Sequence, residues 1–346
     1  MKYALALAGG GTRGAFQAGV WQALGEMGIE ISAVAGTSIG AVNGAMFAMG
    51  IDPAELWLKT DISDIVKIGE NNGNLFSIKS LRAVMKEELK GGLDTAPFKK
   101  LLSSLIDEEK LRGCPMDYGL CTYCVTDKKS VELFKEDIPR GYLVDYILAS
   151  ACFPMFKNIV INDKEYADGG IQNNLPSGML INRGYDTIIS VSVNGIGFVR
   201  DVDRCGINII KIDSPAPEVG LMDFDHEAIE RSMKSGYFET MRTFGKCRGE
   251  SYFIDNYSYG EFVSQYGSEI VKGLELAAGL SGVDRCRMYT VQELTESVMG
   301  SYTKNSRLKH MTEIIRNSEH GFIREKLDVL GNLFHAANTI IYLTKK

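Results

Sequence analysis

Residues 36–40 read Gly-Thr-Ser-Ile-Gly, a G-x-S-x-G sequence that can carry a nucleophilic serine. The apolar residues 33–35 before it are expected to form a strand, and a helix is expected directly after Ser38. A strand, a tight turn and a helix in this order expose a serine hydroxyl at the edge of a sheet, and the flanking Gly36 and Gly40 let the backbone turn without side-chain clashes. The pattern therefore predicts Ser38 as the nucleophile of an acyl transfer. The alternative is a serine that serves only as the amino-terminal cap of the helix.

Residues 9–14 read Gly-Gly-Gly-Thr-Arg-Gly and lie between the first expected strand and the first expected helix. Consecutive small residues can aim several backbone N–H groups at one point, where they would stabilise an oxyanion that forms during acyl transfer. Arg13 lies at the start of a helix, where a cation opposes the helix dipole. We expect it to anchor the glycine loop or to meet a substrate phosphate, with a surface salt bridge as the alternative.

The same run also matches G-x-G-x-x-G, the fingerprint of a dinucleotide-binding loop. That interpretation needs an acidic residue about 20 positions further on, at the end of the second strand, to hold the ribose hydroxyls. In this chain the second strand ends in Gly36-Thr37-Ser38 instead. A P-loop fits less well still, because no Gly-Lys-Ser/Thr closes the run. A nucleotide-binding protein that uses residues 9–14 stays as the alternative function.

Asp168-Gly169-Gly170 follows an expected strand, and its two glycines free the backbone to bring the carboxylate close to another loop. Alone, this sequence would be an ordinary Asp-Gly turn. A carboxylate can act as general base if it hydrogen-bonds the serine hydroxyl directly and is partly shielded from water, which raises its proton affinity. The chain has four histidines, all beyond the last expected strand of the sheet: His226, His310, His320 and His335. We therefore expect no histidine in catalysis.

Apolar periodicity places these motifs on a repeated pattern of strand, glycine turn and helix. An apolar strand is expected at residues 3–7 and a helix at 15–27, then a strand at 31–35 and a helix at 39–49. Further helices are expected at 78–89, 98–105, 142–151 and after residue 176, and further strands near 118–125, 131–134, 159–166, 187–193 and 207–212. This order predicts an α/β fold of three layers, α/β/α, with a mostly parallel central sheet. Ligand chemistry in such folds lies at the carboxyl ends of the strands, where both glycine turns fall.

From about residue 225 onward the pattern is mainly helical, with a polar, tyrosine-rich break at 249–267. We take this break as the domain edge, which predicts a catalytic domain over residues 1–248 and a helical C-terminal extension of unknown role over 249–346. The last segment has apolar residues on one helical face: Ile323, Leu327, Leu330, Phe334, Ala337 and Ile341. We interpret it as a helix packed on its own domain, with a lipid-surface or dimer helix as the alternative.

Composition sets broad limits on the class of protein. With 45% hydrophobic and 24% charged residues the chain is an ordinary globular protein, and its net charge of −6 argues against a nucleic-acid partner. The apolar run at residues 4–8 is too short for a signal sequence, and no stretch approaches the ~20 apolar residues of a membrane span. Seven cysteines, an odd number, favour a reducing compartment. We expect a cytoplasmic protein that can lie on a membrane without crossing it.

The three motifs at 9–14, 36–40 and 168–170, in this order, resemble those of patatin-like phospholipases, as does the Ala-Ser-Ala-Cys-Phe-Pro segment at 149–154. The resemblance spans about the first 250 residues. It implies that Gly10, Gly11 and Thr12 lie at the oxyanion hole, that Ser38 is the nucleophile and that Asp168 is its only partner. The resemblance assigns supporting places to Arg13, Gly36, Gly40 and Gly169.

The same resemblance implies a hydrolase of lipid acyl esters, of the phospholipase A or lysophospholipase type, that needs no metal and no cofactor. Its substrate would be a phospholipid or a lysophospholipid. A lipid-binding scaffold with this fold is the remaining alternative, although a chain that carries both Ser38 and Asp168 does not favour it. The oligomeric state is left open by the sequence.

Overall fold

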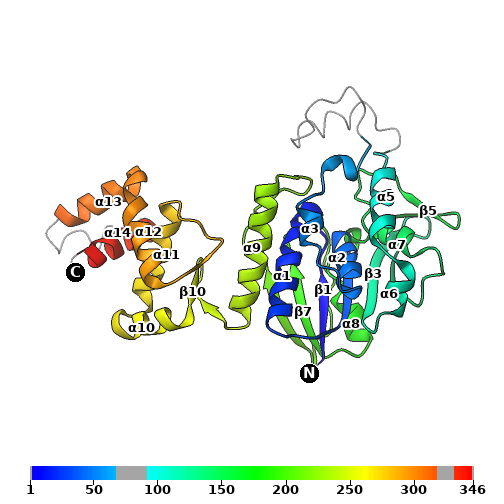
Figure 1. The fold of residues 1–346 in the computed structure, drawn as a ribbon, viewed down its shortest axis with the longest axis horizontal. Helices are drawn as coiled ribbons and strands as arrows, with labels where there is room; N and C mark the ends of the chain where they lie inside the picture. The colour runs from blue at the N-terminus through cyan, green and yellow to red at the C-terminus, as the bar shows by residue number, and fades with distance from the viewer. Residues whose placement is uncertain (1, 68–91, 318–330, 345–346) are drawn as a thin grey trace. The chain divides into compact units, whose positions relative to one another are not determined.

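The computed structural model describes residues 2–67, 92–317 and 331–344. It divides into two compact units, Met1–Thr240 and Met241–Lys346 (Figure 1). The boundary that the sequence suggested, between residues 248 and 249, falls a few residues after this division.

The first unit is built around an eight-stranded mixed sheet, and five neighbouring strands of it run parallel in the order β3-β2-β1-β7-β8. These strands are β1 (Tyr3–Leu7), β2 (Ile31–Thr37), β3 (Asp117–Cys124), β7 (Thr187–Ser192) and β8 (Asn208–Asp213). β3 also pairs antiparallel with β4 (Lys129–Phe134) and β6 (Lys164–Asp168), and β5 (Ile159–Ile161) pairs with β6. The prediction of a mostly parallel sheet in an α/β fold is confirmed.

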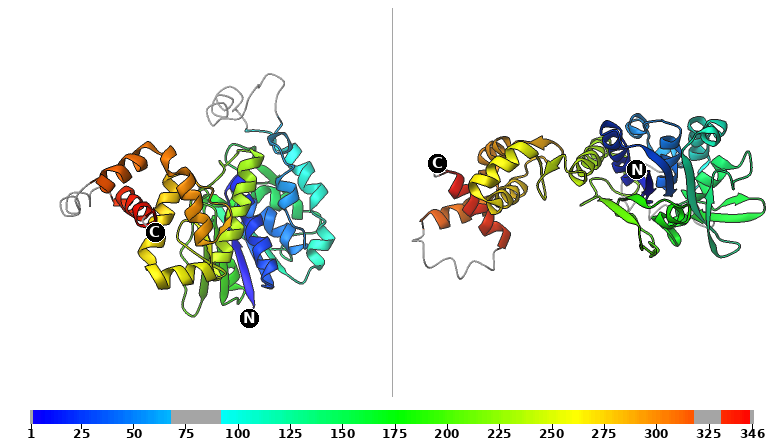
Figure 2. Two further views of the ribbon diagram at one scale, coloured as in Figure 1. Left: turned by 60° about the vertical axis from the view of Figure 1, so that its left-hand side comes forward. Right: turned by 90° about the horizontal axis from the view of Figure 1, so that it is seen from below.

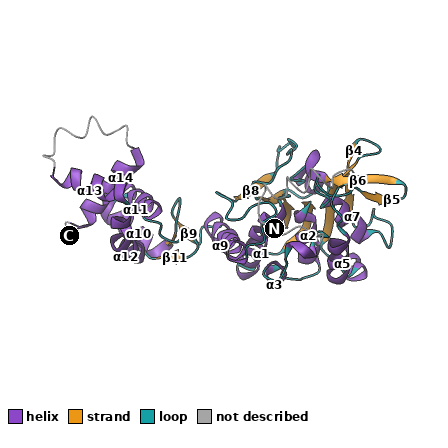
Figure 3. Cartoon of the chain, turned by 90° about the horizontal axis from the view of Figure 1, so that it is seen from above, coloured by secondary structure: helices purple, strands orange, loops and turns teal. Residues whose placement is uncertain are grey.

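Helices cover both faces of the sheet, which gives the three predicted layers; Figure 3 shows α1, α2 and α5 along one side of the strands. Because side chains alternate along a strand, Ala4, Ala6 and their neighbours pack under α8 (Ser177–Asn182), whereas Leu7 lies on the face of α2, near Gly44. Over the described residues, the other helices of this unit are α1 (Ala15–Glu26), α2 (Ile39–Ala48), α3 (Ala54–Trp57), α5 (Ala96–Leu105), α6 (Glu108–Gly113), α7 (Leu143–Ser150) and α9 (His226–Thr243).

Helices α1 and α9 touch through their backbones. A Cβ at Gly19 would lie 1.8 Å from the carbonyl oxygen of Met233, and a Cβ at Gly236 would lie 2.0 Å from that of Phe16. Only glycine fits at both positions, because any side chain would force the helices apart. This close packing holds α1, and with it the glycine loop that precedes α1, against the rest of the unit.

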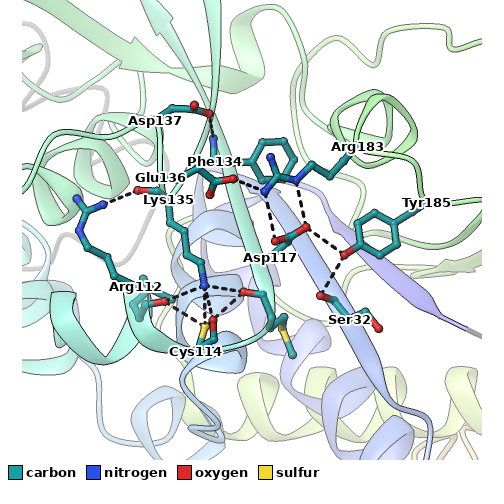
Figure 4. A network of polar contacts seen from close by, with 12 residues as sticks. Ser32, Arg112, Cys114, Asp117, Phe134, Lys135, Glu136, Asp137, Arg183 and Tyr185 are labelled. Carbon is teal, nitrogen blue, oxygen red and sulfur yellow. Dashed lines mark hydrogen bonds and ion pairs between the residues drawn. The ribbon is translucent and has the colours of Figure 1, made fainter.

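A network of polar contacts lies at the amino ends of β2 and β3, at the end of the sheet opposite Ser38 (Figure 4). Arg183 Nε lies 3.1 Å from a carboxylate oxygen of Asp117, and the Tyr185 hydroxyl donates to the same oxygen at 3.1 Å. Lys135 follows β4 and donates to the Met116 carbonyl at 2.9 Å and to that of Cys114. These contacts tie α8 and β4 to the start of β3, so they fix the sheet at the end opposite Ser38.

The second unit is mainly helical and also contains a small three-stranded sheet. Its described elements are β9 (Cys247–Arg248), β10 (Phe253–Asp255), α10 (Asn256–Tyr266), α11 (Ser268–Leu280), β11 (Met288–Tyr289), α12 (Val291–Ser301), α13 (Ser306–Asn317) and α14 (Gly331–Thr344). The prediction of an irregular break at 249–267 is wrong, because α10 occupies most of it. The Asp255 side chain accepts from the amides of Tyr257 and Ser258 at 3.0 and 2.9 Å, and this cap starts the helix despite its polar composition.

The C-terminal helix α14 packs within its own unit, against α11 and α13 (Figure 2). Ala337 and Ile340 are fully buried in the core of this unit, and Phe334 packs against that core. The apolar face therefore fits the interpretation of a packed helix. The predicted positions Ile323, Leu327 and Leu330, like the helix expected at 78–89, lie outside the described residues. Among the residues described, no helix is long and apolar enough to cross a membrane.

Candidate active site

Ser38 lies on a sharp turn between β2 and α2, at the carboxyl end of the parallel strands. Its φ of 57° and ψ of −128° lie in a region that residues with a side chain rarely adopt. Gly36 and Gly40 make the turn possible, since a Cβ at Gly36 would lie 2.1 Å from the Gly40 carbonyl oxygen and a Cβ at Gly40 would lie 2.4 Å from that of Leu7. The turn has the strand–turn–helix geometry expected from the sequence.

A buried serine on α7 holds this turn in place. The main-chain amide of Ser38 donates to the Ser150 hydroxyl at 2.9 Å, and that hydroxyl donates to the Cys121 carbonyl at 2.7 Å. The Thr37 hydroxyl donates to the Asn173 carbonyl at 2.8 Å. Sequence reasoning missed Ser150, although it lies in the segment at 149–154 that resembles the patatin-like phospholipases. Its partner is far away in the chain, so no local spacing reveals the contact.

Asp168, the expected partner of the serine, is the last residue of β6. The Ser38 side chain interacts with its carboxylate and favours the ionised form, and the amide of Gly170 donates to Oδ1 at 2.8 Å. Gly169 allows the tight turn after the strand, because a Cβ there would lie 2.2 Å from the Cys121 carbonyl oxygen. Burial raises the pKa of Asp168 to about 6, although Ser38 and the Gly170 amide oppose the shift.

The glycine loop lies beside this pair, since a Cβ at Gly9 would lie 2.8 Å from the Ser38 Cβ. Within the described part of the chain, the amides of Gly10 and Gly11 have no hydrogen-bond partner. Thr12 differs from the expectation. Its amide donates to the Leu221 carbonyl at 3.0 Å and its hydroxyl donates to the Gly220 carbonyl, so neither group is free for an oxyanion.

Arg13 ties the glycine loop to two other loops. Its guanidinium donates to the carbonyl of Asn194 and, at 3.3 Å, to that of Val219. Of the alternatives for this residue, the geometry fits the anchor: the cation is held by carbonyl oxygens, and it is not among the residues that line the cavity at Ser38.

A cavity of about 400 Å³ opens at Ser38 and reaches between α2, α5 and the loop after α7. Its size suits a small-molecule site. Asp168 is the one ionisable side chain among its described lining residues, and most of the wall is apolar. The apolar wall includes Val42, Leu56, Trp57, Phe98, Leu102 and Phe153. Because the described lining has no cationic group to meet phosphates, this setting favours acyl transfer over nucleotide binding by the glycine loop.

The comparisons with known proteins agree with the fold and the motifs. Residues 5–181 match the family model of the patatins, described as patatin-like phospholipase. This match spans half of the chain, and the chain therefore belongs to the patatin-like phospholipase family.

Among curated relatives, the chain is 27% identical over 198 residues to patatin-like phospholipase domain-containing protein 7 of Rattus norvegicus, covering 55% of this chain and 13% of that protein. It is 30% identical over 195 residues to lysophospholipase nte1 of Aspergillus terreus, covering 56% and 12%. An uncharacterized NTE family protein of Mycobacterium tuberculosis is 31% identical over 207 residues, covering 58% and 52%. The chain thus spans between about an eighth and a half of the length of these relatives.

Among solved structures, VipD from Legionella pneumophila aligns over 94% of this chain and 79% of its own, with a TM-score of 0.44 and 15% identity.

Proposed function

We propose that this protein hydrolyses the acyl esters of phospholipids or lysophospholipids through an acyl-enzyme on Ser38. One observation carries the proposal: Ser38 and the buried carboxylate of Asp168 line the same apolar cavity, and Ser38 favours the ionised form of that carboxylate. The curated relatives include lysophospholipases, and their named activity supports the choice of lipid substrate.

In the first half of the reaction, Ser38 Oγ forms a bond to the ester carbonyl carbon while the Asp168 carboxylate accepts the hydroxyl proton. The amides of Gly10 and Gly11 stabilise the negative carbonyl oxygen. The carbon–oxygen bond to the alcohol then breaks, and Asp168 returns the proton to the leaving oxygen. Thr12 is left out of this oxyanion hole because both of its donors are engaged.

In the second half, water attacks the acyl-enzyme. Asp168 takes a proton from the water as its oxygen bonds to the carbonyl carbon, and the proton passes to Ser38 Oγ when the fatty acid leaves. A pKa of about 6 suits this double role, because the carboxylate is ionised near neutral pH and yet holds a proton more strongly than an exposed aspartate does.

The apolar wall suits the acyl chain, and the ester would lie at the polar end between Ser38 and the glycine loop. A cytoplasmic protein that meets its lipid at a membrane surface fits this chemistry and the odd number of cysteines, seven.

The proposal is tested by incubating the purified protein with lysophosphatidylcholine, diacyl phosphatidylcholine and a short soluble ester. Fatty-acid release is expected from at least one lipid, and Ser38→Ala and Asp168→Asn should each abolish it. Ser264→Ala, at an exposed serine of the second unit, is the control and should keep full activity. Lipid binding without release by the unaltered protein would instead support a scaffold.

A further inference from the structure

Three exposed apolar side chains line the cavity at Ser38 and a fourth directly follows them in the chain, and we call the four the apolar rim: Ile171, Ile196, Phe198 and Val199. Phe198 is 75% exposed, Ile196 71% and Val199 59%. Large apolar side chains gathered in this way on a protein surface mark a place of contact with another apolar phase. We propose that the apolar rim inserts into the surface of a phospholipid bilayer and brings the cavity to its substrate.

The rim is held by the catalytic loops themselves. The Phe198 amide donates to the Gly170 carbonyl at 3.0 Å, and the Asn174 amide donates to the Phe198 carbonyl at 2.5 Å. On the other side, Gly195 packs on the glycine loop so closely that a Cβ there would lie 1.9 Å from the Gly9 carbonyl oxygen. The backbone of the rim is therefore fixed to both sides of the Ser38 site, and its side chains project from a defined support.

The rim and the cavity form one surface, because Ile171, Ile196 and Phe198 also line the cavity. A lipid phase pressed on the rim would meet the opening through which an acyl chain must enter. A protein partner on the rim would instead cover that opening. Four side chains are also few for a stable protein interface, which uses about 20–30 residues on each side. The occupant that fits is a lipid surface, and this choice rests on the proposed function.

Charge near the rim favours apolar insertion over attraction to anionic lipid. Residues 200–204 carry two arginines and two aspartates, so their charges balance, and the whole chain has a net charge of −6. The Arg200 guanidinium lies 3.5 Å from a carboxylate oxygen of Glu132 and donates to the Gln172 side chain at 3.1 Å. Binding should therefore occur on zwitterionic lipid and depend little on salt, unlike that of polybasic membrane proteins.

The test measures flotation with phosphatidylcholine vesicles in a Ser38→Ala background, so that no hydrolysis takes place. The double change Ile196→Ser with Phe198→Ser should lower the vesicle partition coefficient at least tenfold, because it removes the two most exposed apolar side chains of the rim. Val160→Ser is the matched control. Val160 is 65% exposed on β5 but does not line the cavity, so its change should leave partition unaltered.

A second variant reports insertion without removing apolar area. A tryptophan placed by Phe198→Trp should be quenched by brominated phosphatidylcholine, and one placed by Val160→Trp should not. Unaltered partition of the double variant, equal losses in the Val160 control, or no quenching at position 198 would overturn the proposal. So would a shift from dimer to monomer in the double variant at unaltered partition, since that result makes the rim a protein interface.

These measurements separate the rim from the proposed function. Flotation and quenching that behave as expected, in a protein that releases no fatty acid from any ester, would leave the rim standing and overturn the hydrolase. If the protein hydrolyses esters but its rim variants float as the parent does, the hydrolase would stand and the rim proposal would be overturned.

Discussion

The Ser150 hydroxyl accepts a hydrogen bond from the main-chain amide of Ser38 and so fixes the backbone of this residue. Ser38 occupies a backbone region that costs about 1–3 kcal/mol and persists only where its surroundings enforce it. The second hydrogen bond, from Ser150 to the Cys121 carbonyl, links the turn to β3. Ser150 is thus a positioning residue for Ser38, the proposed nucleophile.

Ser150→Ala should lower kcat about tenfold or more with little change in KM, because the change misplaces Ser38 Oγ and leaves the lining of the cavity intact. It should also lower the free energy of unfolding by about 1–3 kcal/mol, since the buried Ser38 amide loses its acceptor. Steady-state kinetics and chemical denaturation check the two effects. A higher KM at unchanged kcat would mean that Ser150 shapes the cavity instead.

The pH dependence follows from the burial of Asp168. Its pKa is raised to about 6, and the carboxylate must be ionised to accept the Ser38 proton. We expect kcat/KM to fall about tenfold per pH unit below 6 and to level off above it. A profile that stays flat from pH 5 to 8, measured on a soluble ester, would show that another group is the base.

The raised pKa of Asp168 affects folding stability in the opposite direction to activity: it makes the fold more stable at low pH, whereas activity requires the higher pH. Between about pH 4 and 6 the folded protein holds a proton on Asp168 that the unfolded chain releases, so the stability due to this group is present below pH 4 and lost as pH rises through 6. Asp168→Asn should therefore raise the free energy of unfolding at pH 8, by up to about 3 kcal/mol, and change it little at pH 4. Equal effects at both pH values would contradict a raised pKa.

The oxyanion hole is tested at Gly10, where a Cβ would lie 2.6 Å from Val193 Cγ2. Gly10→Ala should displace the glycine loop from Val193 and lower kcat about 10- to 100-fold, because the amides of Gly10 and Gly11 would no longer point at the oxyanion. Adding Val193→Ala makes room and should restore part of the loss. Gly25→Ala, where a Cβ meets nothing within 4 Å, is the control. Full activity of Gly10→Ala would remove this loop from the mechanism.

No histidine should be needed. None of the described residues that line the cavity is a histidine. His226, in the first unit, lies half-exposed with Nε2 3.5 Å from a carboxylate oxygen of Asp61, a surface contact of little energetic weight. The four single His→Ala variants should each keep most of the activity on a soluble ester. A folded His→Ala variant that is as inactive as Ser38→Ala would show that this histidine takes part in catalysis together with Ser38 and Asp168.

The sequence predicts the strands and helices near Ser38 well, because the glycine turns interrupt strongly apolar segments there. Gly36 and Gly40 are needed for the local turn, so a local pattern reveals them. The place of Ser150 and that of the proposed oxyanion donors depend instead on contacts between distant segments. Thr12 shows the difference: its place in the loop is local, whereas its engagement with Leu221 arises only when the chain folds. The polar residues 256–266 were misjudged because the Asp255 cap outweighs their composition.

The assignment of Ser38 as nucleophile is tested most directly by a fluorophosphonate, which labels an activated serine covalently. After reaction with the intact protein, digestion and mass spectrometry should locate one adduct, on the peptide that contains Ser38. Labelling should be lost in Ser38→Ala and strongly slowed in Asp168→Asn, since the hydroxyl then lacks its base. An adduct on another serine, or no adduct on a protein that hydrolyses lipid esters, would contradict the assignment.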